Sequence, residues 1–300
     1  MEKISFEKYT GAGNDFVLLD RANQSELQIT PGLVRSLCNR RFGVGGDGLL
    51  LIDPASEKDF SMEYYNADGS TGTLCGNGAR CAISYAGSRE YFVKNTTFLC
   101  GGITYSGETF NDGIVKFDLQ PVKEIRNDIS LIVDDYRLTG SFADTGSPHL
   151  VIFVEDIKYR GEKNLNVYDS LDLVPVRELG KKLRYHKEFS PAGVNVNFVE
   201  LKNDLLYIRT YERGVENETL ACGTGSTAAA LILHSLEKSG EMVNLVVRSG
   251  ARLKVNFATD ADGYCDIALT GPAKKVFSGE ILKNNIIEDL DGKSDFFDQI

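Results

Sequence analysis

Two stretches decide the fold of this chain: residues 75–79, which read Cys-Gly-Asn-Gly-Ala, and residues 222–226, which read Cys-Gly-Thr-Gly-Ser. The second stretch stands about half a chain length after the first, and both are followed by small and apolar residues typical of a helix. A weaker repeat relates residues 10–17 to residues 145–151. Two repeats with similar offsets indicate a duplicated unit, so we expect two similar halves with a seam near Pro121.

The remaining pattern predicts short strands and few helices. Compact apolar runs between turn residues predict strands at 15–20, 48–53 and 60–65. Hairpin turns are predicted at 111–113, 202–204, 249–250 and 262–263. Helices are predicted from Pro31 to about Arg40, after Pro175, after Gly78 and from Gly225 to about Leu236. Consecutive hairpins indicate antiparallel pairing rather than a doubly wound sheet, so the fold class is α+β.

Composition excludes several classes of function. The 33 basic residues against 43 acidic ones give a net charge of −10, which offers no positive surface for nucleic acid or an anionic membrane. No apolar run approaches the roughly 18 residues that a membrane span needs. The N-terminal residues alternate charged and apolar side chains and contain no signal-peptide core. We therefore expect a cytoplasmic protein with a small-molecule partner.

The cysteines and histidines exclude two further kinds of site. The six cysteines form no CxxC pair and are too sparse for a disulfide scaffold. The three histidines are scattered and form no HxxxH pattern. We therefore expect no metal held by protein ligands.

The repeated Cys-Gly-x-Gly unit has a chemistry of its own. A cysteine at the start of a helix lies among backbone N–H groups without helical acceptors, at the positive end of the helix dipole. That environment lowers a thiol pKa, and the same N–H groups can bind a carboxylate. If the halves face each other, Cys75 and Cys222 would flank one carbon and could remove a proton from one face and return it to the other. Such a pair predicts stereoinversion at the α-carbon of an amino acid.

Less specific readings compete with this one. A lone Cys-Gly pair is usually a small buried apolar group near a turn. A structural disulfide would also bring Cys75 and Cys222 together, although a cytoplasmic protein rarely needs one. The duplication favours catalysis for this pair, and the other four cysteines are expected to be structural: Cys38, Cys81, Cys100 and Cys265.

These residues match a known family. Residues 66–69 and 75–81 resemble the first catalytic signature of diaminopimelate epimerase, and residues 212–214 with 218–225 resemble the second. Further matches stand at residues 11–16, 43–47 and 148–149, in the family's order. The paired cysteine motifs are highly specific, whereas the glycine motifs alone would be weak.

The resemblance implies a fold and an activity. The fold would have two similar lobes related by a pseudo-twofold axis, each with β-strands around a central helix and the site in the cleft between them. The expected lobes are residues 1–121 with about 277–300, which carry Cys75, and residues 122–276, which carry Cys222. The activity would be cofactor-independent interconversion of L,L- and meso-diaminopimelate, in lysine and peptidoglycan precursor synthesis.

The resemblance also implies roles for single residues. Cys75 and Cys222 would be the two bases. The donors to the α-carboxylate would be Gly76, Asn77, Gly223 and Thr224. The other substrate contacts would be Asn14, Asn66, Asn195, Glu212 and Arg213, of which Glu212 contacts an ammonium and Asn66, Asn195 and Arg213 read the distal end. His149 would lie near the thiols and tune them.

Each of these residues also has an ordinary structural interpretation. Asn14, Asn66 and Asn195 could be turn residues, Glu212 and Arg213 a solvated surface pair, His149 a structural histidine, and Asp47 a loop-shaping residue. The sequence departs from the family at two positions, since Gly48 replaces a common glutamine and Ser147 a common asparagine. Both changes remove hydrogen-bonding groups, so the contact pattern is expected to differ. The tail from about Lys283 to Ile300 is interpreted as a surface appendage.

Three other functions compete with the epimerase. The first is a racemase, free of pyridoxal phosphate, for another amino acid such as histidine. The second is a two-lobed protein that binds amino acids or phosphates without catalysis. The third is an isomerase of the phenazine-biosynthesis type, which is disfavoured because those relatives lack the cysteine pair. The sequence leaves a monomer and a homodimer open.

Overall fold

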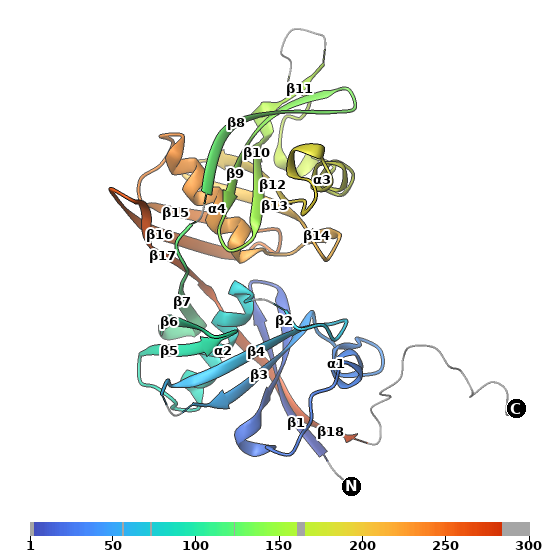
Figure 1. The fold of residues 1–300 in the computed structure, drawn as a ribbon, viewed down its shortest axis with the longest axis vertical. Helices are drawn as coiled ribbons and strands as arrows, with labels where there is room; N and C mark the ends of the chain where they lie inside the picture. The colour runs from blue at the N-terminus through green and yellow to red at the C-terminus, as the bar shows by residue number, and fades with distance from the viewer. Residues whose placement is uncertain (1–2, 56, 73, 123, 161–165, 284–300) are drawn as a thin grey trace, which may run out of the picture. The chain divides into compact units, whose positions relative to one another are not determined.

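The computed structural model describes residues 3–55, 57–72, 74–122, 124–160 and 166–283. The tail beyond Lys283, for which a surface appendage was expected, lies outside the described residues. The chain divides into two compact units: the first unit is Met1–Gly113 with Ala273–Ile300, and the second unit is Ile114–Pro272 (Figure 1).

The first unit is a mixed sheet with two helices. Its helices are α1 (Pro31–Cys38) and α2 (Gly76–Ser88), and its strands are β1 (Lys3–Gly11), β2 (Asn14–Asp20), β3 (Gly48–Pro54), β4 (Phe60–Asn66), β5 (Asn95–Cys100), β6 (Ile103–Thr109) and β18 (Lys274–Leu282). The strand order is β18-β1-β2-β3-β4-β5-β6. The pairs β2–β3 and β4–β5 are parallel and the others antiparallel.

The second unit is also a mixed sheet with two helices. Its helices are α3 (Val176–Arg184) and α4 (Gly223–Ser235), and its strands are β7 (Ile114–Asp118), β8 (Glu124–Val133), β9 (Tyr136–Asp144), β10 (Pro148–Phe153), β11 (Ile157–Tyr159), β12 (Asn195–Lys202), β13 (Leu205–Glu212), β14 (Asn217–Thr219), β15 (Met242–Val246), β16 (Arg252–Asp260) and β17 (Gly263–Pro272). The main order is β8-β9-β10-β12-β13-β15-β16-β17-β7. The pairs β10–β12 and β13–β15 are parallel.

The two units share one plan. The run β18-β1-β2-β3-β4-β5-β6 and the run β8-β9-β10-β12-β13-β15-β16 pass through the same succession of antiparallel and parallel pairs. The helix that follows each Cys-Gly-x-Gly start spans 13 residues in both units. The predicted α+β class and the duplicated architecture are confirmed. The predicted seam near Pro121 falls between β7 and β8, and the second expected boundary near residue 276 falls within β18.

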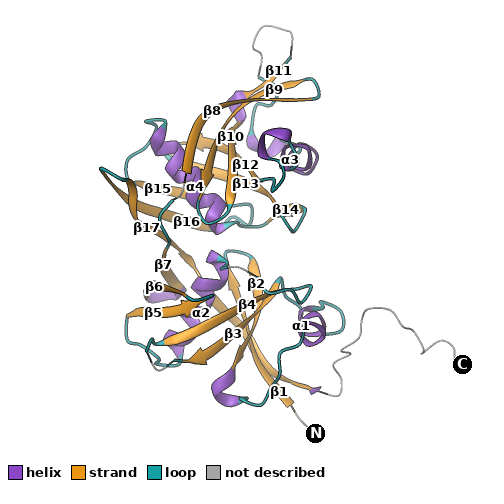
Figure 2. Cartoon of the chain, viewed as in Figure 1, coloured by secondary structure: helices purple, strands orange, loops and turns teal. Residues whose placement is uncertain are grey.

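The helices α2 and α4 lie at the centres of their units. Ten of the 13 residues in each helix are buried, and residues 228–233 of α4 are at most 1% exposed. A helix that is buried on all its faces leaves no face for solvent, so other elements must surround it. Strands of its own unit contact each helix on several sides, as Figure 2 shows. Such a core fixes the N-terminus of each helix firmly, and with it the cysteine that precedes the helix.

Local signals account for most of the elements. Thr30 caps α1 through a bond from Leu33 N–H to its Oγ1 (3.1 Å), with Pro31 as the first helical residue. Helix α3 begins after Pro175, as predicted. The turn between β12 and β13 places Asn203 and Asp204 at positive φ, as a tight hairpin requires.

One sequence expectation was incomplete. The hairpins predicted antiparallel pairing, but each unit also contains two parallel pairs. Parallel neighbours need a crossover connection, which α1 supplies between β2 and β3 and α2 between β4 and β5.

No helix within the described ranges is long and apolar enough to cross a bilayer.

Candidate functional site

The first half-site is built on the start of α2. Cys75 is the N-cap residue, with extended backbone (φ −104°, ψ 120°), and its carbonyl accepts the first helical bond from Ala79 N–H at 2.7 Å. The N–H groups of residues 76–78 therefore precede the helical ladder and point out of its N-terminus. The thiol is half-buried. The structure thus places a thiol beside backbone donors and the positive end of a helix dipole.

The second half-site repeats this arrangement on α4. Cys222 is the N-cap, with φ −121° and ψ 114°, and its carbonyl accepts from Ser226 N–H at 2.9 Å. The residue is only 7% exposed. The equal lengths and equal caps of the two helices mean that each unit offers one thiol and one set of N-terminal donors.

The second glycine of each motif lets the helix start pack closely. A Cβ at Gly225 would lie 2.4 Å from Asn197 Oδ1 and 3.3 Å from both Cys222 Sγ and His149 Cε1. A Cβ at Gly78 would meet the side chain of Leu50 at 3.1 Å. At residue 225 any side chain would displace the polar groups beside the thiol, so the motif requires glycine there.

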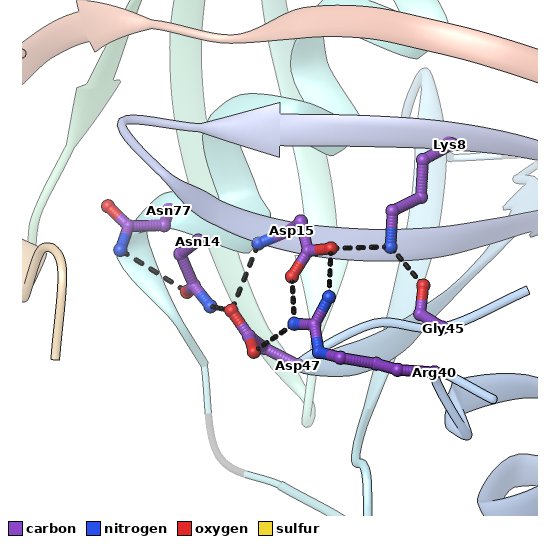
Figure 3. Close-up of polar contacts among 7 residues, drawn as sticks. All are labelled: Lys8, Asn14, Asp15, Arg40, Gly45, Asp47 and Asn77. Carbon is purple, nitrogen blue, oxygen red and sulfur yellow. Dashed lines mark hydrogen bonds and ion pairs between the residues drawn. The ribbon is translucent and has the colours of Figure 1, made fainter. Parts of the chain in front are cut away.

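A chain of side-chain amides leads to Cys75. Arg80 Nη2 donates to Asn77 Oδ1 (2.8 Å), Asn77 Nδ2 donates to Asn14 Oδ1 (3.3 Å), and Asn14 Nδ2 donates to Asp47 Oδ2 (2.6 Å). Figure 3 shows the part of this chain from Asn77 to Asp47. Cys75 Sγ lies 3.7 Å from Asn14 Oδ1, within reach of an S–H donor. The structure therefore brings together Asn14, Asn77 and Cys75, which the sequence predicted for one site.

An ion cluster supports the end of this chain (Figure 3). Arg40 bonds both oxygens of Asp15 (2.9 and 2.6 Å) and Asp47 Oδ1 (2.7 Å). Lys8 lies 2.7 Å from Asp15 Oδ2 and also donates to the carbonyl of Gly45. Burial alone would raise the pKa of Asp15, but the bonds from Arg40 and Lys8 outweigh it and hold that pKa well below its usual range. Asp47 therefore orients Asn14, a role that its interpretation as a loop-shaping residue missed.

The amide of Asn197 fixes the imidazole of His149. Asn197 Nδ2 donates to the carbonyl of Leu150 (3.0 Å), and its Oδ1 accepts from the hydroxyl of Thr210 (2.9 Å). The same Nδ2 lies 3.2 Å from His149 Nδ1, which must therefore accept. A neutral His149 consequently carries its proton on Nε2.

The Nε2 atom of His149 leads to the second thiol. It lies 2.9 Å from Ser147 Oγ and 3.0 Å from Thr224 Oγ1, and Thr224 Oγ1 lies 3.5 Å from Cys222 Sγ. The departure at Ser147 therefore keeps a hydrogen-bonding group, contrary to the expected loss. His149 is fully buried, and burial, with Arg213 nearby, lowers its pKa from 6.5 to about 3.

The buried neutral histidine predicts a pH-dependent stability. The folded-state pKa of His149 lies below that of the unfolded chain, so the unfolded state binds this proton first as the pH falls. The stability that the folded protein gains from a neutral His149 is fully present above pH 6.5 and is lost as the pH falls toward about 3. We expect the wild type to lose about 1.4 kcal/mol of unfolding free energy per pH unit more than His149→Gln in this window. Urea unfolding of both proteins from pH 7.5 to 4.5 measures this difference, and parallel losses would contradict it.

Asn66 and Gly48 are paired residues on the neighbouring strands β4 and β3. Asn66 is the last residue of β4, and its Nδ2 donates to Ser70 Oγ (3.0 Å). Gly48 does not leave an empty space where another side chain would stand. A Cβ there would lie 2.6 Å from Tyr64 Cε2, and a Cβ at Gly72 would lie 2.3 Å from Tyr64 Cδ1. The ring of Tyr64 therefore occupies the space beside Gly48.

The remaining predicted residues lie together in the second unit. Asn195 is buried, donates to the carbonyl of Pro148 (2.9 Å) and accepts from Arg213 N–H (2.8 Å). The Arg213 side chain is half-buried, with Nη1 3.4 Å from the carbonyl of Ala192. Glu212 is the last residue of β13 and is half-buried. Asn195 thus holds the backbone of Arg213 and is itself bonded to main chain on both sides.

Sequence reasoning missed three residues of the two half-sites: Asp47, Arg80 and Asn197. Arg80 carried a signal, because a lone charge stands in an otherwise small and apolar helix, and the structure finds it 0% exposed. Asn197 carried a weaker one, as a polar residue between Val196 and Phe198 in a buried strand.

Among the side chains of the described residues, no three His, Cys, Asp or Glu are arranged to hold a metal ion. A pocket of about 550 Å³ in the first unit is lined at the far end of α2 by Glu7, Arg89 and Lys275, and none of the predicted catalytic residues lines it.

Comparison with known proteins gives consistent matches. The model of the diaminopimelate epimerase family matches residues 6–102 and 141–276. A diaminopimelate epimerase from Chlorobaculum tepidum is 40% identical over 91% of this chain and 99% of its own length. A diaminopimelate epimerase from Archaeoglobus fulgidus is 36% identical over 96% of this chain and 100% of its own.

Solved structures with low sequence identity share the fold. A phenazine biosynthesis protein of the PhzF family from Bacillus anthracis matches with a TM-score of 0.70 at 14% identity, over 94% of this chain and 100% of that one. A hydroxyproline epimerase from Agrobacterium vitis matches with a TM-score of 0.69 at 13% identity, over 98% of this chain and 96% of that one. At such identities the likeness concerns the fold alone.

Proposed function

The chain belongs to the diaminopimelate epimerase family, an isomerase family of lysine biosynthesis, and we propose that it interconverts L,L- and meso-diaminopimelate with Cys75 and Cys222 as its two bases. The observation that carries the proposal is the repeated helix start. Each unit presents one N-cap thiol beside backbone N–H donors, in the same local geometry. No cofactor takes part in the proposed reaction.

The reaction needs one thiolate and one thiol on opposite faces of the α-carbon. The thiolate takes the α-proton, and the electron pair of the broken C–H bond delocalises into the α-carboxylate. The opposite thiol then gives its proton to the other face of the carbon, so the protonation states of the two sulfurs are exchanged. The N–H donors at residues 76–77 and 223–224 bind the carboxylate and stabilise the charge that develops there. Exclusion of water from around the bound substrate would strengthen these interactions.

The distal end of the substrate is a second amino-acid group. Asn66, Asn195 and Arg213 are proposed to bind it, because an amide pair and a guanidinium suit an ammonium and a carboxylate. Glu212 is proposed to contact an ammonium. Asn14 and His149 would act beside the thiols, since each lies in the hydrogen-bond chain that ends on one of them.

The thiol chemistry also favours a reducing compartment. Both proposed bases lose their function when oxidised, and the cytoplasm keeps thiols reduced. We therefore place the protein in the cytoplasm.

Proton NMR in D₂O tests the proposal. We expect L,L-diaminopimelate incubated with the purified protein, without pyridoxal phosphate or added metal, to give the meso isomer with deuterium at the inverted α-carbon. Histidine, proline and glutamate are the control substrates and should show no exchange. Exchange with one of these and none with diaminopimelate would replace the proposed substrate. Binding of diaminopimelate without any exchange would indicate a binding protein.

A further inference from the structure

We propose that the first unit binds an α-amino acid, as its zwitterion, in the pocket of about 550 Å³ at the far end of α2. Every residue that lines this pocket belongs to the first unit. The groups that would hold the ligand are Glu7 on β1, Arg89 just after α2 and Lys275 on β18. The inference goes beyond the proposed reaction, because Cys75 stands at the start of α2 and a helix of this length separates its ends by about 20 Å.

The carboxylate of Glu7 is buried, and only one of its two oxygens is paired. The residue is 8% exposed. Its Oε1 accepts from Arg89 Nη2 (2.8 Å) and from Lys275 Nζ (2.9 Å). Its Oε2 is buried too, and no hydrogen bond reaches it from the described residues. Since the large majority of buried side-chain oxygens have a partner, Oε2 points to a donor on a bound molecule.

The hydroxyl of Tyr9 does not supply that donor. It interacts with the Glu7 carboxylate, and burial together with this negative charge raises the pKa of Tyr9 to about 12, against the opposing effect of the Ser88 hydroxyl. It forms no hydrogen bond to Glu7 Oε2. Tyr9 is therefore a neutral neighbour of the carboxylate and adds no charge to the pocket.

A β-bulge turns Lys275 toward the carboxylate. The register between β1 and β18 shifts by one residue, which leaves Val276 outside the ladder and pairs Tyr9 with Lys275. Opposed residues of antiparallel strands share a face, so Lys275 lies on the face of Tyr9, whose ring packs edge-on against Tyr85 of α2. In a regular ladder Val276 would oppose Tyr9, and Lys275 would point to the other face. The bulge therefore accounts for the contact between Lys275 and Glu7.

Arg89 is held in place by contacts other than the one to Glu7. Its Nε donates to Tyr85 Oη (3.1 Å), and its guanidinium lies 5.2 Å from the centroid of the same ring. Tyr85 Oη in turn donates to the carboxylate of Asp20 (2.6 Å). Arg89 Nη1 takes part in none of these hydrogen bonds, so the guanidinium can bind a second carboxylate while it keeps Glu7. The Arg89 side chain is partly exposed, which lets a ligand reach it from solvent.

Charges of both signs meet in this pocket. Its cations are Arg89, Lys274 and Lys275, and its carboxylates are Glu7 and Asp112. A carboxylate flanked by cations is the complement of a molecule whose own ammonium and carboxylate stand on one carbon. The α-ammonium would donate to Glu7 Oε2, and the α-carboxylate would accept from the cations beside it.

Ligands with a single charge fit this pocket less well. A simple anion could bind the cations, but it would leave Glu7 Oε2 unpaired and would meet the negative charge of that residue. A simple amine could bind Oε2, but it would face the three cations. The zwitterion pairs both signs at once, so it is the class of ligand that the pocket favours.

Calorimetric titration of the full chain tests the proposal. The probe is L-norleucine, whose unbranched side chain is uncharged, like the rest of the lining. Hexanoate lacks its ammonium and pentylamine lacks its carboxylate, and both are titrated at the same pH and ionic strength. We expect norleucine to bind with a Kd of about 1 mM or below, which so small a ligand can reach. Each analogue should bind at least about tenfold more weakly, because each loses one charged hydrogen-bonding group.

The three ligands decide between the classes. Absence of saturable norleucine binding would overturn the proposal. Equal affinity for hexanoate would show a site for anions, and equal affinity for pentylamine a site for amines; either result would refute binding of the zwitterion. The series needs only the wild-type protein, so it stays decisive if a variant fails to fold.

The substitution Glu7→Gln tests which group holds the ammonium. The glutamine would turn its oxygen to Arg89 and Lys275 and place its Nε2 where Oε2 stands, and an amide nitrogen cannot accept from an ammonium. Norleucine binding should therefore weaken at least about tenfold. Unchanged binding would place norleucine elsewhere and refute the assignment.

The substitution Glu90→Gln is the matched control. It removes the same charge from the exposed residue that follows Arg89, and Glu90 does not line the pocket. Its affinity for norleucine should equal that of the wild type. Equal losses in Glu90→Gln and Glu7→Gln would show a general effect of charge and overturn the role of the Glu7 carboxylate.

The measurement is independent of the proposed reaction. Cys75→Ala should bind norleucine as the wild type does, because Cys75 stands at the other end of α2. Failure of norleucine binding would leave the two-base scheme intact, and absence of epimerase activity would leave this site intact. The two failures are therefore distinguishable.

Discussion

Alanine at either Cys75 or Cys222 is expected to lower epimerisation of diaminopimelate by about 10³-fold or more. A positioned acid or base contributes about 10² to 10⁴ in rate, and no other group is proposed to supply the proton on the same face. The loss should appear in kcat, because the N–H donors that bind the carboxylate belong to the backbone and remain. Thermal unfolding should change little, since the substitution removes one sulfur atom from the start of a helix that is otherwise buried.

The two variants should differ in the half-reaction that each retains. With only one base, the α-hydrogen of one stereoisomer can still exchange with solvent deuterium, whereas inversion is lost. We therefore expect each variant to exchange one isomer and to leave the other untouched, with the preference reversed between them. Cys100→Ala and Cys265→Ala are matched controls, because neither residue belongs to a half-site. Full epimerase activity in Cys75→Ala or Cys222→Ala would refute the two-base scheme.

Local chemistry explains why so much of the fold was predictable. The helix caps at Thr30 and Pro175 and the hairpin at 203–204 are decided by a few neighbouring residues, and each appears where the sequence predicts it. The duplicated Cys-Gly-x-Gly unit was visible because each copy needs the same backbone at a helix start. The parallel pairs β2–β3 and β4–β5 were not predictable in this way, because their partners are set by crossover helices rather than by turns.

The side-chain networks of the half-sites were less accessible from the sequence. Asp47 stands far from Cys75 in the chain, and only the pairing of β2 with β3 brings it to Asn14. Asn197 reaches His149 because β10 and β12 are parallel neighbours, a pairing that hairpin signals cannot indicate. Both residues serve to orient an amide or an imidazole. That function depends on which residues are neighbours in the folded structure, so it produces no recognisable spacing of residues along the sequence.

The two departures from the family show the same limit. The sequence alone interprets Gly48 and Ser147 as lost hydrogen-bonding groups. In the structure the ring of Tyr64 stands against Gly48, and Ser147 Oγ lies 2.9 Å from His149 Nε2. A small residue can therefore make room for a neighbour or keep a bond with a shorter side chain. Neither outcome is visible without the strands that place these residues.

Oxidation is expected to inactivate the protein completely and reversibly. If the two bases flank one carbon, the two sulfurs can come within disulfide distance when no substrate lies between them. Diamide would then take up two electrons and two protons from the thiols of Cys75 and Cys222 and leave one S–S bond. Dithiothreitol should restore turnover by thiol–disulfide exchange. Activity before and after reduction, with peptide mass spectrometry of the linked cysteines, measures both effects.

Substrate protection and single-cysteine variants distinguish a disulfide between Cys75 and Cys222 from other kinds of oxidative damage. Saturating diaminopimelate should slow the inactivation, because the α-carbon would lie between the sulfurs. Cys75→Ala and Cys222→Ala should form no cross-linked peptide, whereas Cys265→Ala should form it as the wild type does. A cross-link that joins residues 75 and 222, which belong to different units, reports directly on whether the two helix starts meet. Inactivation that proceeds with no such peptide, and at the same rate with substrate bound, would mean that the two thiols do not share one site.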